Sequence, residues 1–94
     1  MKEAKLQTYK ARFEGLKMKE YENIVAYFLR EDEVVISIRG LGEKLEESIV
    51  VKKVLRSLLE KYDPKVSTLD QSRELKTLKI DELQGILTTY EMRK

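Results

Sequence analysis

Residues 22–30 read ENIVAYFLR, a stretch that places an acid, an aromatic residue and an arginine five and three residues apart. Apolar positions in and after this stretch keep the three-and-four spacing of one helix face. A helix is therefore predicted over residues 21–39, ended by Gly40 and Gly42, because glycine readily adopts a positive φ. The β-branched run at 34–38 also suits a strand. No partner strand is evident in the sequence, so a helix is preferred.

The rest of the chain carries the same helical periodicity. Apolar residues from Leu6 to Leu16 step by three, four and three. Asp63-Pro64 is a helix-start signal, with the carboxylate as N-cap and proline in the first turn. The sequence therefore predicts an all-α fold, a small bundle of about five helices in one domain covering residues 1–94. The further helices are expected over about 2–17, 46–61 and 64–72, and from about Ile80 onward.

One glycine falls inside an expected helix. Gly85 lies between apolar positions of the last helix, where glycine costs about 1 kcal/mol relative to alanine. Either another backbone approaches closely at this position, or the helix simply tolerates the glycine. The two interpretations carry equal weight.

Composition removes most catalytic chemistry. The chain has 94 residues, no cysteine and no histidine. Disulfides, Cys or His zinc sites, thiol nucleophiles and imidazole bases are therefore excluded. No cofactor, small-molecule substrate or enzymatic activity is expected. No apolar run approaches 18 residues, and the basic N-terminus lacks the apolar stretch of a secretion signal, so we expect no membrane partner and a cytoplasmic location.

Two clusters resemble active sites only superficially. Three adjacent helical carboxylates point about 100° apart and cannot converge on one metal ion, so the acids at 31–33 are expected to form a solvated face. Glu46 and Glu47 are better explained as helix-start residues that oppose the helix dipole. Gly40-Leu41-Gly42 lacks the third glycine and the preceding strand of a dinucleotide site.

The spacing of Glu22, Tyr27 and Arg30 resembles the major homology region of retroviral capsid proteins. That region reads Gln-Gly-x-x-Glu-x-x-x-x-aromatic-x-x-Arg, and these three residues fall on its last three fixed positions. Met18 and Lys19 stand in place of its Gln and Gly. The resemblance implies that Glu22 and Arg30 join a hydrogen-bonded network that fixes the turn before the helix at 21–39.

A second set of matching segments covers nearly the whole chain. They are LKMKE (16–20) followed by YFxR (27–30), IRGLGE (38–43), VLRSL (54–58), YDxKV (62–66) and ELxGxLxxYE (82–91), where x is an unspecified position. In order and spacing these segments resemble the Gag polyprotein of plant copia-type LTR retrotransposons. The chain departs from the usual family pattern at Leu59, where proline is common, and at Lys79, where Ser or Thr is common. The first change is expected to lengthen a helix, and the second removes a capping side chain.

This resemblance implies a structural, non-enzymatic domain that associates with copies of itself as a homodimer or higher oligomer. Residues 18–94 would correspond to the C-terminal lobe of capsid, and the helix at 2–17 to the upstream region. Exchange of that helix between copies remains open. Wide apolar faces on the helices at 2–17 and 46–61 supply candidate interface residues, with core packing as the alternative for each, and Val51 and Leu59 are the hardest to place in a single core. The candidates are Phe13, Leu16, Val51, Val54, Leu55, Leu58 and Leu59.

Charge is distributed in blocks along the chain. Residues 20–47 carry eight acids and three bases, whereas residues 48–79 carry four acids and eight bases. Two basic groups could contact RNA phosphates weakly, although pairing with the acidic block of the same or a neighbouring copy is the preferred explanation. A domesticated adaptor that binds another protein is the remaining alternative. The candidate RNA contacts are Lys5, Lys10, Arg12, Lys52, Lys53 and Arg56.

Overall fold

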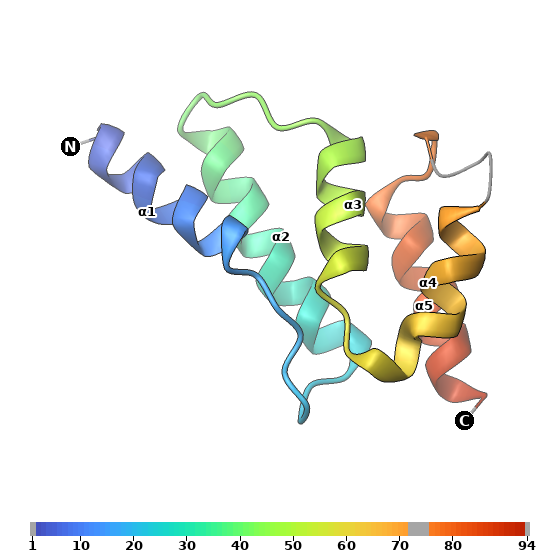
Figure 1. Ribbon diagram of the computed structural model, residues 1–94. Helices are drawn as coiled ribbons and strands as arrows, with labels where there is room; N and C mark the ends of the chain where they lie inside the picture. Colours follow the sequence, from blue (N-terminus) through green and yellow to red (C-terminus); the bar gives the residue numbers. More distant parts are fainter. Residues whose placement is uncertain (1, 72–75, 94) are drawn as a thin grey trace.

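The computed structural model describes residues 2–71 and 76–93, and every regular element among them is helical (Figure 1). This confirms the predicted all-α class, and the β-branched run at 34–38 is part of a helix. The described helices are α1 (Lys2–Glu14), α2 (Ile24–Gly40), α3 (Glu47–Arg56), the 3₁₀ turn η1 (Glu60–Tyr62), α4 (Asp63–Asp70) and α5 (Ile80–Met92).

The helices form a flattened body with extents of 45 × 31 × 17 Å. α1 packs against α2 of the same chain, α2 against α5, and α3 against α5 (Figure 1). α4 follows η1 and lies beside α5. The core collects at the junction of α2, α3 and α5, with side chains from the connection before α2 closing one end. Its least exposed members are Ile24, Tyr27, Val51, Val54, Leu83 and Leu87.

The connection between α1 and α2 is longer than predicted. α1 ends at Glu14 and α2 begins at Ile24, whereas the sequence predicted helix up to 17 and again from 21. Leu16 and Met18 are buried, and the Met18 backbone N–H donates to the Ser57 carbonyl at 2.8 Å. These tertiary contacts hold the connection in a non-helical form.

Asn23 sets the start of α2. Its backbone is extended and its side-chain Oδ1 accepts a hydrogen bond from the Ala26 N–H at 2.8 Å. This is the bond expected of an N-cap residue. At the other end, α2 stops at Gly40, and Gly42 has a φ of 90°, as predicted from the glycine pair.

The helix predicted over 46–61 is also shorter in the structure. α3 ends at Arg56, and Leu59 is extended with φ −63° and ψ 153°. Leu59 therefore does not lengthen the helix, and that prediction was wrong. The break lets η1 turn the chain so that Tyr62 enters the core at 1% exposure.

The predicted N-cap at Asp63 was also wrong. Asp63 is the first residue of α4, not its cap, and its side chain makes no cap hydrogen bond. A Cβ added at Gly85 would meet no atom of the described residues within 4 Å, so of the two interpretations of this glycine, simple tolerance is the one that holds. α4 ends at Asp70, two residues before the predicted end at 72, a position outside the described residues.

The start of α5 agrees with the prediction at Ile80. Lys79 provides no side-chain cap, as expected from the absence of Ser or Thr at this position. Carboxylates replace that cap: Glu82 accepts from the Lys79 N–H at 3.1 Å, and Glu47 of α3 accepts from the Ile80 N–H at 2.9 Å. α3 therefore fixes the position where α5 begins.

Candidate functional site

Glu22 and Arg30 form a two-point ion pair before and within the first turns of α2. Arg30 Nε donates to Glu22 Oε2 at 2.6 Å, and Nη2 donates to Oε1 at 2.7 Å. Nη2 also donates to the Lys17 carbonyl at 2.7 Å, and Glu22 Oε1 accepts from the Lys19 N–H at 2.8 Å. The network expected from the sequence is thus present, and it closes the connection onto α2.

Electrostatics favour the charged form of this pair. The hydrogen bond from Arg30 lowers the pKa of Glu22, and backbone bonding to Lys19 lowers it further. The hydrogen bond to Glu22 in turn raises the pKa of Arg30. The Glu22 side chain is only 5% exposed, against 38% for Arg30. Arg30 therefore compensates the burial of the Glu22 carboxylate, which indicates a structural pair.

Tyr27, the third residue of the pattern formed with Glu22 and Arg30, lies on the core side of α2. Its side chain is fully buried, and its hydroxyl donates to the Val54 carbonyl of α3 at 3.1 Å. The ring meets Phe28 edge-on, with centroids 5.8 Å apart. Burial raises the pKa of the Tyr27 hydroxyl well above its ordinary value. Tyr27 therefore remains a neutral donor that joins α2 to α3.

Glu91 joins three elements and was not assigned a role from the sequence. Its Oε2 accepts from the Ile24 N–H at 3.0 Å and from the Tyr62 hydroxyl at 2.8 Å. A carboxylate from α5 thereby occupies the positive end of the α2 dipole. Burial, followed by the bond to Glu91, raises the pKa of Tyr62. The only sequence signal was the position of Glu91 within the last matching segment.

The expectation that the acids at 31–33 form a solvated face was wrong for Glu31. Asp32 and Glu33 are exposed, but Glu31 is 2% exposed. It borders a small cavity of about 90 Å³ between α2 and α5. Burial, reinforced by Asp32, Glu47 and Asp81 and opposed by Arg39, raises the pKa of Glu31 to about 7.

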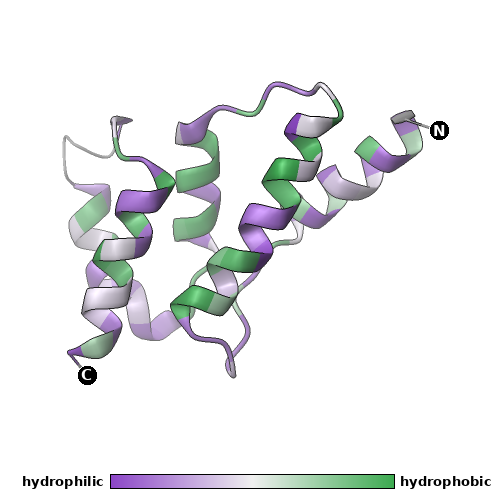
Figure 2. Cartoon of the chain, turned by 180° about the vertical axis from the view of Figure 1, so that it is seen from behind, coloured by the Kyte–Doolittle hydropathy of each residue, from purple (hydrophilic) through white to green (hydrophobic). Residues whose placement is uncertain are grey.

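The outer face of α2 exposes apolar side chains. Val25, Leu29 and Ile36 are 45%, 66% and 60% exposed, and their spacing of four and seven residues places them on one stripe. Figure 2 shows α2 across the front of the molecule, with apolar sections on both sides of a polar middle. We call the surface formed by Val25, Leu29, Asp32, Glu33 and Ile36 the α2 outer face.

The outer face of α3 combines one apolar residue with bases. Ile49 is 48% exposed, and Lys52 and Arg56 are exposed three and seven residues later. Lys53 lies beside them and donates to the Glu14 carbonyl at 2.6 Å. We call the surface formed by Ile49, Lys52 and Arg56 the α3 outer face.

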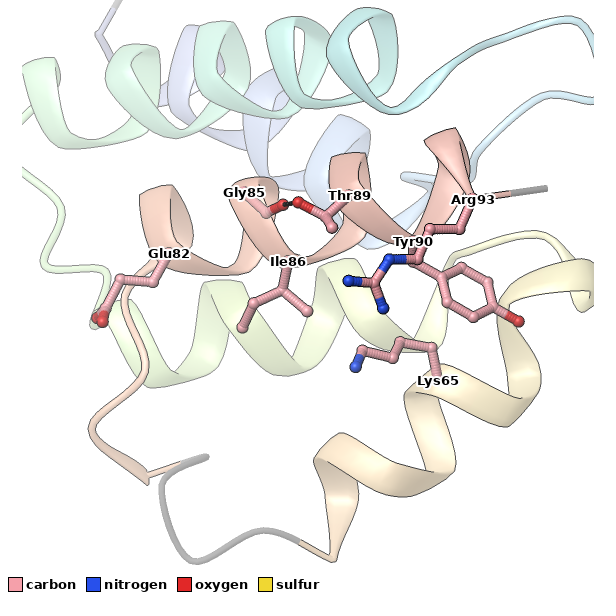
Figure 3. Close-up of a pocket in the computed structure, with 7 residues that line it drawn as sticks. All are labelled: Lys65, Glu82, Gly85, Ile86, Thr89, Tyr90 and Arg93. Carbon is pink, nitrogen blue, oxygen red and sulfur yellow. Dashed lines mark hydrogen bonds between the residues drawn. The ribbon is translucent and has the colours of Figure 1, made fainter.

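An open groove of about 560 Å³ lies between α4 and α5. Lys65 reaches from α4 toward Tyr90 and Arg93 at the end of α5, and the bond from Thr89 to the Gly85 carbonyl lies along the wall (Figure 3). Glu82 also lines this groove. Across the described part of the chain, no group of three or more acidic, His or Cys residues is placed to hold a metal ion.

Comparison with known proteins identifies the family. The family model described as gag-polypeptide of LTR copia-type matches residues 1–94. The chain belongs to this family. Comparisons with curated proteins and with solved structures found no match. Within residues 2–71 and 76–93, none of the helices of this Gag-family chain is both long and apolar enough to span a bilayer.

The structure places most of the predicted interface residues in the core of the Gag-family chain. Val51 is fully buried, so the expectation that it fits poorly inside a single core was wrong. Leu58 and Leu59 are half-buried and pack against the core. Core packing, the alternative held open for each residue, describes the remaining candidates, which are Phe13, Leu16, Val54 and Leu55.

The candidate RNA contacts separate into two groups. On α1, Lys10 pairs with Glu43 at 3.0 Å, and Arg12 stacks over Tyr9 at 5.2 Å, while Lys5 is exposed. On α3, Lys52 and Arg56 are exposed, and Lys53 and Arg56 border a hollow of about 350 Å³ together with Lys17. The α3 group is therefore the more available of the two.

Proposed function

We propose that this copia-type Gag chain is a non-enzymatic structural domain that associates with copies of itself through the α2 outer face. Family membership supports a structural Gag role. The observation that carries the proposal is the exposure of Val25, Leu29 and Ile36 on one stripe. In an assembly of Gag copies, this contact would contribute to a particle.

The exposed stripe gives association a driving force of limited size. Burying a whole aliphatic side chain contributes roughly 1.5–3 kcal/mol, and Leu29 and Ile36 each have more than half of their surface left to bury. Association costs at least about 4 kcal/mol in lost translational and rotational freedom. Weak pairing, visible at high protein concentration, is therefore expected from a single contact.

The buried polar residues fit a scaffold. Tyr27 and Tyr62 are neutral donors to oxygen acceptors within the fold. Glu22 is held as a carboxylate by Arg30. The carboxyl of Glu31, whose pKa is raised to about 7, borders a cavity of only about 90 Å³. Pockets that bind ligands typically have volumes of roughly 300–1,000 Å³. These groups have positions suited to holding helices together.

Sedimentation velocity tests the proposed surface. The variant Leu29→Gln/Ile36→Gln removes apolar surface while keeping good helix formers, and it should weaken self-association at least tenfold. Met92→Gln is the matched control, because Met92 is 80% exposed on α5 and is not part of the α2 outer face. Equal association of all three proteins would contradict the proposal. A parent that stays monomeric would favour the adaptor alternative, in which another protein covers the stripe.

A further inference from the structure

We infer that copies of this chain associate head to tail, with the α2 outer face of one copy packed on the α3 outer face of the next. This inference rests on the proposed self-association and specifies its partner surface. It follows from the opposite charges of two exposed helix faces, each of which has a charged residue three positions after an exposed apolar one.

The α2 outer face is acidic and its charges are free. Asp32 and Glu33 lie among Leu29 and Ile36 and form no hydrogen bond or ion pair with any described residue. The arginines of α2 do not neutralise them: Arg30 is held by Glu22, and Arg39 donates to the Leu45 carbonyl at 2.7 Å. The surface therefore offers two unpaired carboxylates beside apolar contacts.

The α3 outer face is its basic counterpart. Lys52 and Arg56 are exposed and have no hydrogen bond or ion pair with the described residues. Ile49 precedes Lys52 by three residues, as Leu29 precedes Asp32 by three. On each face, a charged residue therefore lies about 4.5 Å along the helix axis from an apolar residue. When the two faces pack together, the apolar residues can contact each other while the opposite charges pair.

Pairing of like faces is unfavourable. Two α2 outer faces related by a two-fold axis between residues 32 and 33 would bring four carboxylates together. Two α3 outer faces would likewise bring Lys52 and Arg56 against their own copies. Like charges placed against each other across an interface cost several kcal/mol. The unlike pair replaces this repulsion with attraction.

Within one copy, the α2 outer face and the α3 outer face do not cover each other. Leu29, Ile36 and Ile49 remain 48–66% exposed in the single chain, although α2 and α3 are neighbours joined by the hydrogen bond from Tyr27 to the Val54 carbonyl. Each copy therefore keeps one acidic and one basic face. A contact between two different surfaces continues from copy to copy unless the rotation closes a ring.

Charge reversal tests this arrangement. Variant one carries Asp32→Lys and Glu33→Lys, variant two carries Lys52→Glu and Arg56→Glu, and variant three carries all four substitutions. Each reversal should lower the association constant at least tenfold in sedimentation velocity, because it places like charges in the contact. Variant three should regain association to within about threefold of the parent. An equimolar mixture of variants one and two should also associate. Circular dichroism of each variant checks that the helices are intact.

Several results would overturn the inference. If the parent associates and variant three stays as weak as variants one and two, the two faces do not meet. If variant two associates like the parent but loses retention of a single-stranded RNA probe, the α3 outer face is an RNA surface. In both cases self-association stands and only the head-to-tail contact fails. A parent that remains monomeric instead removes the proposed function on which the inference rests.

Discussion

The guanidinium of Arg30 bonds both carboxylate oxygens of Glu22, at 2.6 and 2.7 Å, and also bonds the Lys17 carbonyl. Eight residues separate the two side chains, and the pair spans the junction between the connection and α2. Because Glu22 is nearly buried, it depends on Arg30 for its charge. The pair therefore links the folding of residues 15–23 to α2.

Replacement of Arg30 should destabilise the fold. Arg30→Ala leaves the Glu22 carboxylate buried and unpaired, which costs 3–5 kcal/mol in fully buried pairs. Because Arg30 is 38% exposed, we expect a smaller loss of about 2 kcal/mol in urea unfolding. Arg30→Lys should recover only part of it, since lysine lacks the planar fork. Arg56→Ala is the control and should change stability by less than about 0.5 kcal/mol. Equal effects of Arg30→Ala and Arg56→Ala would contradict the role of the pair.

Glu31 should make stability fall as pH rises toward neutrality. Its pKa is raised from 4.5 to about 7 in the fold, so its contribution is fully present below pH 4.5 and is lost as pH rises through 7. Glu31→Gln should remove this slope and be more stable than the parent at pH 8 by up to about 3 kcal/mol. Urea unfolding at pH 5, 6, 7 and 8 measures it, with Glu33→Gln as an exposed control that retains the slope. A parent whose stability does not change across this range would refute the prediction.

Glu91 and Tyr62 should act as a coupled pair. Tyr62→Phe removes a hydrogen bond to a charged acceptor, worth about 1.5–3 kcal/mol. Glu91→Gln keeps an acceptor but removes the negative charge from the start of α2, at a cost of about 1 kcal/mol. In a double-mutant cycle the two losses should be less than additive by at least about 0.5 kcal/mol. Additive losses would show that the negative charge of Glu91 adds nothing to its 2.8 Å bond with Tyr62.

Two glycines should respond oppositely to alanine. Gly85 lies within α5, and a Cβ there meets nothing within 4 Å, so Gly85→Ala should stabilise the protein by about 0.5–1 kcal/mol. Gly42 has a φ of 90°, so Gly42→Ala should destabilise it by about 1 kcal/mol or more. Thermal unfolding of the two variants gives the signs. A loss of stability in Gly85→Ala would indicate a close neighbour at this position after all.

Helices were predictable because their signals are local. The three-and-four spacing of apolar residues predicts both ends of α2 and the start of α5 to within three residues of their observed positions. Gly40 and Gly42 mark the end of α2. The connection at 15–23 was not predictable in the same way. Its form depends on the bond from the Met18 N–H to the Ser57 carbonyl, and the two residues are far apart in the sequence.

Burial was harder to predict than periodicity. A wide apolar face on α3 was compatible with either core or interface, and only the packing of α3 with its neighbours puts Val51 at 0% exposure. Glu31 stands in a run of four charged residues in the sequence, yet it is buried beside α5. The roles of Glu91 and Glu47 depend on hydrogen bonds that cross 67 and 33 residues. Such pairs have no local sequence signal.

Light scattering of the unaltered chain over a concentration series tests the central claim of self-association most directly. The account predicts a mass that rises continuously from 11.1 kDa beyond twice that value as concentration reaches the high micromolar range. It also predicts that added salt lowers the mass by screening the charges at the contact. A mass that stays at 11.1 kDa at every concentration and at low salt would contradict the account.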